Sequence, residues 1–565
     1  MTRAPRRRPE GTSDEVTLHE SFFGRFPKAR ILFEDEDLIA VDKPFGLSTH
    51  AAEKDRTDDL VSWLKADCEA RGVSSYLGIH QRLDKDTSGL VIFTRRKEAN
   101  AKIAEQFERR TARKRYVAVV SGRIPDSGRL DHWMSEGRTE RRNIRTFTKD
   151  KRPNEQSAHA TFEVKERRGR QSVVELTLET GRTHQLRAQL SAIKAPIVGD
   201  TLYDGPAHRR LMLHAWSLTL NHPTTNEPVT FEAPRPAEFD GKTLSLLDEI
   251  ELAACGRVGI PKEGVTTAFR LIHREADGFP DLTVDLYGEY AVLSLYRVFE
   301  PSELEARAKA LLEFGVRGVY VKHRPKNASR IVDSRRDDVA PKLPIAGEAA
   351  PSPMLVHEHG MPFEVRLDDG LSTGVFLDQR DNRERVRALA SGKSVLNLFA
   401  YTGAFSVAAV VGGAKETVTV DASQTAIDWA RRNLDRVGAD TASHRTIVLD
   451  VFDFLVRAKA RKESWHMVIV DPPSFSTTKK TVWSAESEFV KLSARCFEVL
   501  KPGGLMLACT NHKNIHPGKF RRMLHDGARE AGVVVKQMKE GKVPSDFPTL
   551  GEEASHLKSL FVTVD

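Results

Sequence analysis

The sequence has few cysteines and no long apolar run. Four of its 565 residues are cysteine, and their scattered positions show neither metal-ligand spacing nor a disulfide framework. No stretch approaches the roughly 20 apolar residues that a membrane span needs. The beginning of the chain, MTRAPRRRPEGTSDE, lacks the apolar core of a secretory signal. We therefore expect a cytoplasmic protein that binds no metal and does not enter a membrane.

The chain does have enough apolar sequence for several cores, and a small excess of positive charge. Hydrophobic residues make up 40% and charged residues 29%, and Lys+Arg 87 against Asp+Glu 79 gives a net charge of +8. At roughly 150 residues per domain, this length predicts two to four domains. The basic balance suits a polyanionic partner.

The first half is predicted to be α+β. Residues 1–30 are basic and contain prolines, which favours a flexible tail. Over 31–240, short β-like segments such as 90–94 and 116–120 are interrupted by helical stretches such as 97–110. That pattern predicts one domain with a mixed, largely antiparallel sheet.

The second half has a different rhythm. We expect a linker over 241–265, then a small α/β domain, rich in strands, and a further linker over 266–350. From 351 to 565 strands and helices alternate, which predicts an α/β, Rossmann-like doubly wound sheet. Its strands are expected at 394–399, 417–421, 445–450, 466–471 and 505–510.

A charged turn in the first half is a candidate catalytic site. The segment IHQRLDKDTSGLVIF, 79–93, places Asp84 beside cations and ahead of an apolar strand. A carboxylate held among cations stays ionised, and it can attack or stabilise an electrophilic carbon. A second basic segment, TGRTHQLRAQL at 180–190, could supply a counter-cation. A solvated turn explains the same residue types equally well.

HQRLDKDTSGL resembles the signature of the RluA-like pseudouridine synthases. Four further segments match that family in order: DLIAVDKPFGLSTH (37–50), KRYVAVVSG (114–122), ETGRTHQLRAQL (179–190) and IVGDTLYDG (197–205). The resemblance implies an isomerase without a cofactor. It assigns Asp84 as the catalytic carboxylate, Tyr116 as general acid/base, Arg82 as the residue that replaces the flipped uridine, and Arg187 as the salt-bridge partner of Asp84.

The chemistry is consistent with these roles. Pseudouridine formation breaks the N1–C1′ bond, rotates the base and joins C5 to C1′, for which a carboxylate and a phenol suffice. The base must also leave its stack. The sequence departs from the family twice. Gln81 separates His80 from Arg-Leu-Asp, and Arg187-Ala-Gln189 stands where Arg-Val-His is usual.

The second half contains a candidate nucleotide-cofactor pocket. In SVLNLFAYTGAFSVAA, 394–409, a loop with small residues joins a strand to a helix N-terminus, where a ligand can approach the backbone. Because Gly-x-Gly-x-x-Gly is missing, NAD is a weaker interpretation. Asp421 and Asp450 end the next two strands and suit ribose hydroxyls and an adenine amino group. Either Asp also fits a helix N-cap.

These features resemble class I S-adenosylmethionine-dependent methyltransferases. The segment DPPSFS, 471–476, fixes a turn whose carbonyl can bind a base edge. Together with GVFLDQRDNR (374–383) and KPGGLMLACTNH (501–512), it resembles the RlmI/RlmK-like methyltransferases of large-subunit ribosomal RNA, without their usual PUA domain. The resemblance places the cofactor at Asn397, Phe399, Tyr401, Gly403, Asp421, Asp450 and Asp471, and the base at Pro472, Pro473, Phe475 and Asn511.

The acceptor atom depends on one position. Cytosine C5 is not nucleophilic, so its methylation needs a cysteine thiolate to add to C6 first. Where the C5 branch of the family has that cysteine, this sequence has Asn511, and Cys509 lies two residues earlier. A buried small residue is the favoured interpretation of Cys509. We therefore expect a purine nitrogen such as guanine N7, with cytosine C5 as the alternative.

The sequence thus predicts a bifunctional RNA-modification enzyme, a pseudouridine synthase joined to a methyltransferase, that acts on ribosomal RNA. One rival is an RNA-binding ribosome-assembly factor in which one or both sites are inactive. A second is a methyltransferase that acts on protein or a small molecule. The complete sets of candidate residues argue against the first rival, and fusion to an RNA isomerase argues against the second. The sequence predicts no oligomeric state.

Overall fold

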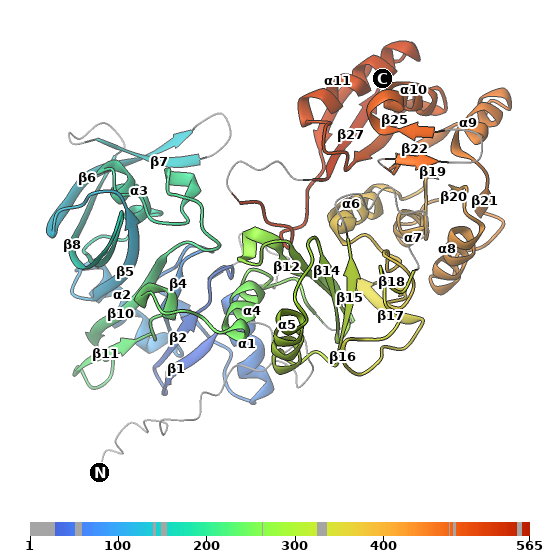
Figure 1. The fold of residues 1–565 in the computed structure, drawn as a ribbon. Coiled ribbons are helices and arrows are strands. Elements are labelled where there is room, and N and C mark those ends of the chain that lie inside the picture. The colour runs from blue at the N-terminus through green and yellow to red at the C-terminus, as the bar shows by residue number, and fades with distance from the viewer. Residues whose placement is uncertain are drawn as a thin grey trace. The chain divides into compact units, whose positions relative to one another are not determined.

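A computed structural model describes residues 29–50, 59–138, 143–148, 155–262, 264–324, 336–473, 475–477, 482–550 and 556–565. For 136–138, 143–148, 475–477 and 482–484 it describes the backbone alone. The chain divides into two compact units, which are described separately (Figure 1). The first unit is Met1–Ile260 with Ala276–Gly278, and the second is Pro261–Glu275 with Phe279–Asp565.

The first unit contains an 11-stranded sheet, in the order β1-β2-β4-β10-β5-β9-β8-β6-β7, with β11 paired to β10 and β3 to β4. All of these pairs are antiparallel except β4 with β10. This confirms the predicted mixed, largely antiparallel sheet. The strands are Arg30–Glu34, Leu38–Lys43, Gly78–Ile79, Ser88–Thr94, Arg113–Ser121, Ser127–Arg138, Asn143–Thr148, Gln156–Arg168, Gln171–Leu178, Leu213–Asn221 and Pro228–Glu232 (β1 to β11).

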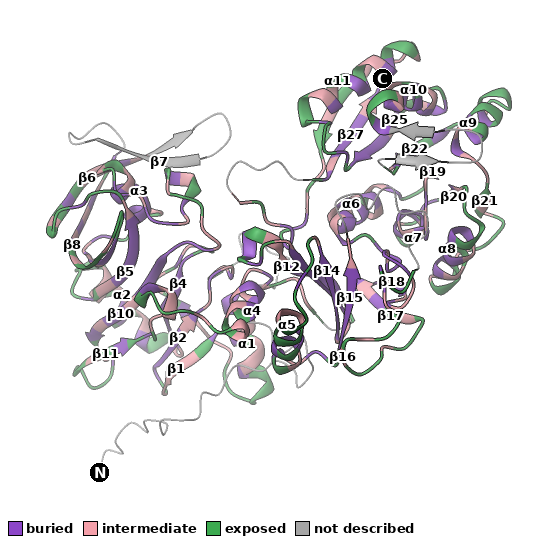
Figure 2. Ribbon diagram, in the orientation of Figure 1, coloured by how far each residue is buried: buried purple, intermediate pink, exposed green. Residues whose placement is uncertain are grey.

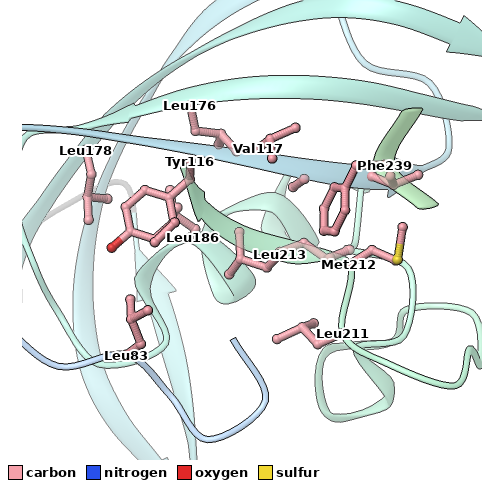
Figure 3. Packing of buried hydrophobic residues seen from close by; sticks show 14 of the residues in the cluster. Leu83, Tyr116, Val117, Leu176, Leu178, Leu186, Leu211, Met212, Leu213 and Phe239 are labelled. Atoms are coloured by element: carbon pink, nitrogen blue, oxygen red, sulfur yellow. The ribbon is translucent and has the colours of Figure 1, made fainter. Parts of the chain in front are cut away.

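Two of the four helices of this unit contribute apolar residues to one large cluster with the sheet. The helices are α1 (Leu60–Ala70), α2 (Lys97–Glu108), α3 (Gln185–Ala192) and α4 (Leu246–Cys255). Figure 3 shows part of the cluster, in which the ring of Tyr116 lies close to Leu83, Leu178 and Leu186. A tyrosine at the edge of the core has a rigidly held ring and a hydroxyl that can still reach a ligand.

One expected linker is wrong. Residues 241–265 contain the helix α4, which a capping box starts: the side chain of Ser245 accepts from the backbone of Asp248, and the carboxylate of Asp248 accepts from the backbone of Ser245. Ile250, Ala253 and Ala254 are its buried residues. The helix forms because its ends are capped and one face is apolar.

The second unit begins with a small sheet, in the order β12-β13-β14-β15-β16, and the hairpin β17-β18. The strands β14 and β15 are buried along almost their whole length (Figure 2). The helix α5 is Pro301–Phe314, and the strands are Ala268–His273, Leu282–Tyr287, Tyr290–Leu295, Gly318–His323, Ala346–Gly347, Met354–Glu358 and Met361–Val365 (β12 to β18).

A 7-stranded sheet follows, in the order β21-β20-β19-β22-β25-β27-β26. The first five strands are parallel, which confirms the predicted βαβ architecture, and β27 runs antiparallel to both of its neighbours. The strands are β19 (Ser394–Leu398), β20 (Glu416–Asp421), β21 (His444–Val448), β22 (Trp465–Val470), β25 (Leu500–Thr510), β26 (Val535–Glu540) and β27 (Lys558–Val564), with a hairpin β23 (Phe475–Thr477) and β24 (Val482–Ser484).

The helices of this sheet are α6 (Arg380–Leu389), α7 (Ala404–Val411), α8 (Gln424–Arg436), α9 (Val451–Ala460), α10 (Ala485–Glu498) and α11 (Pro517–Glu530). In an open parallel sheet, ligands bind outside the carboxyl ends of the strands, where the strand order reverses. Here that point lies between β19 and β22, at the loop after β19 and the turn after β22.

Two candidate active sites

The loop that carries Asp84 joins β3 to β4 and is fixed on both sides of the carboxylate. The hydroxyl of Thr49 donates to the carbonyl of Leu83 at 3.0 Å and accepts from its amide at 3.1 Å. On the other side, the Lys43 ammonium donates to the carbonyl of Lys85 at 3.2 Å. Burial lowers the pKa of Lys43 to about 7, against the pull of nearby acids. Asp84 is therefore presented by an anchored backbone although no regular element holds it.

Arg187 and His184 approach the same oxygen of Asp84. Nη1 of Arg187 lies 3.3 Å from its Oδ2, and Nε2 of His184 lies 3.8 Å from it. Arg187 is more tightly bound to a second acid, because Nε and Nη2 reach the Asp200 carboxylate at 2.7 and 2.8 Å. Burial alone would lower the pKa of Arg187, but Asp200 and Asp84 raise it above its ordinary value. The guanidinium is thus a permanent charge, positioned by Asp200.

Tyr116 lines the same pocket as Asp84. The pocket has a volume of about 670 Å³, and Arg82, which is exposed, also forms part of its wall. Burial, with the added charge of Asp84, raises the pKa of Tyr116 above its ordinary value. The phenol therefore enters any reaction protonated, so that it can donate a proton or a hydrogen bond at once, and must first lose its own proton to act as a base.

The two departures from the family pattern have different surroundings. Gln189 is fully buried, and its amide donates to the carbonyls of Leu130 and Ala158 at 3.0 Å, which ties α3 to β6 and β8. It is a structural residue, away from Asp84. Gln81 lines the pocket and donates weakly to the carbonyl of Leu90 at 3.4 Å. Gln81 is therefore part of the wall of the site itself.

A buried histidine beneath this site predicts acid sensitivity. His214 on β10 bonds to the Ser88 hydroxyl at 2.9 Å, and burial, then the charge of Arg210, lowers its pKa to about 3. In the unfolded chain the imidazole titrates near pH 6.5 and is protonated below that pH. In the folded chain the same imidazole stays neutral there, so protonation stabilises only the unfolded state. We expect unfolding to become easier from pH 6.5 downward, by about 2 kcal/mol at pH 5.

Urea midpoints of the full chain at pH 7 and pH 5 measure this effect. The difference between the two midpoints should shrink in His214→Gln and should stay unchanged in the control His525→Gln, whose side chain is exposed. An equal pH dependence in wild type and His214→Gln would contradict the prediction.

In the second unit, the loop after β19 is strained. Phe399 and Tyr401 have positive φ angles of 54° and 49°, which side chains rarely adopt. The carboxylate of Asp421 holds the loop, since it accepts from the amide of Tyr401 and from that of Ser423, both at 2.9 Å. Gly403 caps α7, and a Cβ there would lie 2.9 Å from the Cβ of Ala430. Strain of this kind is typical of ligand-binding sites.

Three acids end strands at this edge. Asp421 is the last residue of β20, Asp450 lies two residues beyond β21, and Asp471 follows β22 directly. Carboxylates at this edge can accept hydrogen bonds from the hydroxyl and amino groups of a nucleoside, and the neighbouring loop lets such a ligand approach the backbone. Asp450 also caps α9, because its Oδ1 accepts from Phe452 and Asp453 at 2.9 and 3.3 Å, so the N-cap interpretation describes its contacts.

Asn397, which we expected to line the pocket, faces the interior instead. It is 1% exposed, and its amide donates to the Ser406 hydroxyl at 3.0 Å. Strand β19 is buried on both faces, so its side chains do not reach solvent. Through this hydrogen bond Asn397 joins β19 to α7, and its side chain is buried beneath the site.

Asp471 is part of a network that sequence reasoning missed. The Gln379 amide donates to its Oδ2 at 2.8 Å, and the Gln379 carbonyl accepts from Asn382 at 2.6 Å. Burial, followed by the charge of Asp378, raises the pKa of Asp471 to about 7. The signal was the segment GVFLDQRDNR, but a contact across 92 residues becomes visible only in the fold.

The remaining predicted residues of this site differ in burial. Pro472 is buried, whereas Pro473 and Asn511 are exposed, and the side chain of Phe475 lies outside the described residues. Cys509 is fully buried, with its Sγ 3.9 Å from the Gln379 carbonyl oxygen. Burial, then the charge of Asp471, raises the pKa of Cys509 well above its ordinary value.

The described residues contain neither a metal-binding cluster nor a membrane-spanning helix. No group of three or more His, Cys, Asp or Glu side chains is placed to hold a metal ion in the part of the chain that the structure describes. Within the same residues, every helix is too short or too polar to cross a bilayer.

Two family models match the chain. One, described as RNA pseudouridylate synthase, matches residues 37–192, and the other, S-adenosylmethionine-dependent methyltransferase, matches residues 269–563. The first thus covers Asp84 and Tyr116 with Arg187, and the second covers the strained loop and the three acids.

Sequence and structure relatives agree with the second model. Ribosomal RNA large subunit methyltransferase I of Aeromonas salmonicida is 32% identical over 336 residues, which are 59% of this chain and 83% of the relative. Its namesake in Salmonella arizonae is 31% identical over 290 residues, 51% of this chain and 70% of the relative. The structure of SMU.776, a methyltransferase complexed with SAH (S-adenosylhomocysteine), is 29% identical and covers 61% of this chain and 87% of its own, with a TM-score of 0.51. The chain therefore belongs to the S-adenosylmethionine-dependent methyltransferase family and carries an RNA pseudouridylate synthase domain ahead of that region.

Proposed function

We propose that this protein modifies large-subunit ribosomal RNA at two positions, isomerising a uridine in the first unit and methylating a base in the second. The pairing of Asp84 with Arg187, on the wall of a pocket that Tyr116 shares, supports the first activity. The loop at Phe399–Gly403 beside Asp421 supports the second. The relatives named as large-subunit methyltransferases support the choice of RNA.

In the first reaction, Asp84 acts on the ribose side of the uridine after the base has flipped into the pocket. Arg187 orients the carboxylate, and Arg82, exposed at the pocket wall, occupies the gap that the base leaves. Tyr116 holds the rotating base through its hydroxyl, gives its proton to N1 of the uracil once the N1–C1′ bond has broken, and takes the proton from C5 after C5 has joined C1′, so that it ends the reaction protonated as it began.

In the second reaction, S-adenosylmethionine supplies the methyl group. Asp421 and Asp450 accept from its ribose hydroxyls and adenine amino group, while the loop Phe399–Gly403 lets the methionine part approach the backbone. The turn Asp471-Pro-Pro473 and Asn511 hold the acceptor base. With a pKa of about 7, Asp471 is available both as a hydrogen-bond donor and as an acceptor near neutral pH.

A ring nitrogen of a purine, such as guanine N7, is the acceptor that the second site supports best. That atom has a lone pair and needs only positioning. Cytosine C5 would need a thiolate, and Cys509 is fully buried with a strongly raised pKa. Asn511, which is exposed, occupies the position of the expected nucleophile. Cytosine C5 remains the second candidate because Cys509, near the end of β25, lies two residues before Asn511.

Removal of the Cys509 thiol decides between the two. If the acceptor is a purine nitrogen, Cys509→Ala keeps methyl transfer within about threefold of wild type, since a small apolar residue replaces another. Transfer of labelled methyl groups to RNA measures the rate. The matched control is Cys496→Ala, which removes a second buried thiol from α10. A loss of about a hundredfold or more in Cys509→Ala alone would establish the covalent C5 route.

Mass-spectrometric mapping of ribosomal RNA from a deletion strain tests the whole proposal. One pseudouridine and one methylated base should disappear, and return when the gene is restored. Persistence of both would overturn it. An inactive assembly factor would show neither tritium release from 5-tritiated uridine RNA nor binding of S-adenosylmethionine.

A further inference from the structure

The pocket that holds Asp84 extends beyond the residues given a role so far. His80, Phe107 and Lys114 also form its wall. Lys114 and Tyr116 are two residues apart on β5, so their side chains leave the same face of the strand, about 7 Å apart along it. A second group of side chains therefore lines the pocket next to Asp84 and Tyr116.

His80 and Phe107, which both line this part of the pocket, form a stacked pair of rings. Their centroids are 6.3 Å apart and their planes differ by 7°. Nε2 of His80 is fixed by the Thr94 hydroxyl at 3.1 Å, and burial lowers the pKa of His80 below its ordinary value. The imidazole is thus neutral at pH 7. Fixed, neutral π faces on a pocket wall are the surfaces on which unstacked bases pack in single-stranded RNA complexes.

Lys114 adds a positive charge to the same surface. Its Nζ lies 5.7 Å from the Phe107 ring centroid, and Gly181 leaves it room, because a Cβ at that position would lie 3.3 Å from Nζ. Burial lowers the pKa of Lys114, and the neighbouring charge that adds to this effect is a cation, Arg110. A half-buried ammonium beside another cation gains most from an anion, and the anion that accompanies every RNA base is phosphate.

We propose that His80, Phe107 and Lys114 form a subsite for the nucleotide next to the target uridine, with its base on the ring pair and its phosphate on Lys114. The inference rests on the proposed isomerase function. When the target uridine leaves the stack to reach Asp84, the neighbouring base loses its stacking partner. The ring pair would replace that contact. Gln81, the residue that separates His80 from Arg-Leu-Asp, also lines this wall. The subsite would add affinity for the unpaired nucleotide beside the target, whichever base it carries, because every base has a face that can stack.

Kinetics on synthetic RNA strands test the subsite. Each strand carries one 5-tritiated target uridine, and in two of them the base on its 5′ or 3′ side is replaced by an abasic nucleotide. In wild type, one abasic substitution should raise KM about tenfold with kcat nearly unchanged, as expected for a lost base–aromatic stack. Phe107→Leu should raise KM on the complete strand by a similar factor, and should make the abasic strand no worse.

A second variant, at Lys114 on β5, tests the phosphate contact without changing the helix α2 that carries Phe107. Lys114→Gln should raise KM about fivefold and weaken the dependence of KM on salt, because one phosphate contact is lost. The matched controls are Phe33→Leu, which removes a ring packed on Phe231, and Lys65→Gln on the exposed face of α1. Both should behave like wild type.

The outcomes are distinguishable. If wild type releases tritium but Phe107→Leu keeps the wild-type KM and the abasic penalty, the subsite is wrong while the isomerase stands. If wild type releases no tritium from any RNA, the proposed isomerase function fails, and the subsite with it. A fall in kcat without a change in KM would also overturn the subsite, because it would place these residues in the chemistry.

Discussion

Asp84→Asn is expected to abolish pseudouridine formation and leave methyl transfer intact. The amide keeps the size of the side chain, but it cannot act as a nucleophile or a base, so we expect a loss of about a thousandfold or more in kcat. Tritium release from 5-tritiated uridine RNA measures the first activity, and transfer of labelled methyl groups measures the second.

The matched control is Asp86→Asn, which removes an exposed carboxylate two residues away in the same loop. It should stay within about threefold of wild type. Equal losses in both variants would mean that the total charge of the loop matters and that Asp84 has no special role. Retention of activity in Asp84→Asn would remove the carboxylate mechanism altogether.

Asp421→Ala should have the second-largest effect, on cofactor affinity. The carboxylate holds the strained loop through the amides of Tyr401 and Ser423 and is proposed to accept from both ribose hydroxyls. Loss of such contacts costs about 3 kcal/mol, which predicts binding of S-adenosylmethionine about a hundredfold weaker. Isothermal titration of the full chain measures the dissociation constant, while tritium release should not change.

Asp428→Ala is the control for this variant, because it removes a partly exposed carboxylate of α8 that pairs with Arg431 in the next turn. Its affinity for S-adenosylmethionine should equal that of wild type. If Asp421→Ala bound equally well, Asp421 would be only a support for the loop, and the cofactor would have to be held by the other two acids.

Much of the fold could be predicted from local pattern. The alternation of apolar strands and helices between 394 and 510 specified a parallel sheet, and the short strands before residue 240 specified an antiparallel one. The helix α4 was missed because prolines and glycine near residue 240 suggested a linker, although Ser245 and Asp248 carried a capping signal. The capping residues are a local signal that outweighs the turn-forming residues before them.

The candidate sites were less predictable, because their geometry depends on long-range pairs. Asp84 and Arg187 are hydrogen-bonded although 103 positions separate them in the sequence. Asp200 belongs to the site only through its hydrogen bond with Arg187. Gln379 reaches Asp471 across 92 positions. Asn397 was assigned to the cofactor from its place in a motif, whereas a buried strand turns its side chain inward. Motifs identify which residues matter, and burial decides what each one contacts.

The arrangement of two acids on one guanidinium has a consequence for the reaction cycle. Asp200 engages Arg187 through two short contacts, and Asp84 through one longer contact. If Asp84 bonds covalently to the ribose, it becomes an uncharged ester and its attraction for the cation falls away. Arg187 would still be neutralised by Asp200, so no buried positive charge is left unpaired. Asp84 can thus be an uncharged ester during part of the reaction cycle. Formation of that ester carries no free-energy cost from an unpaired Arg187.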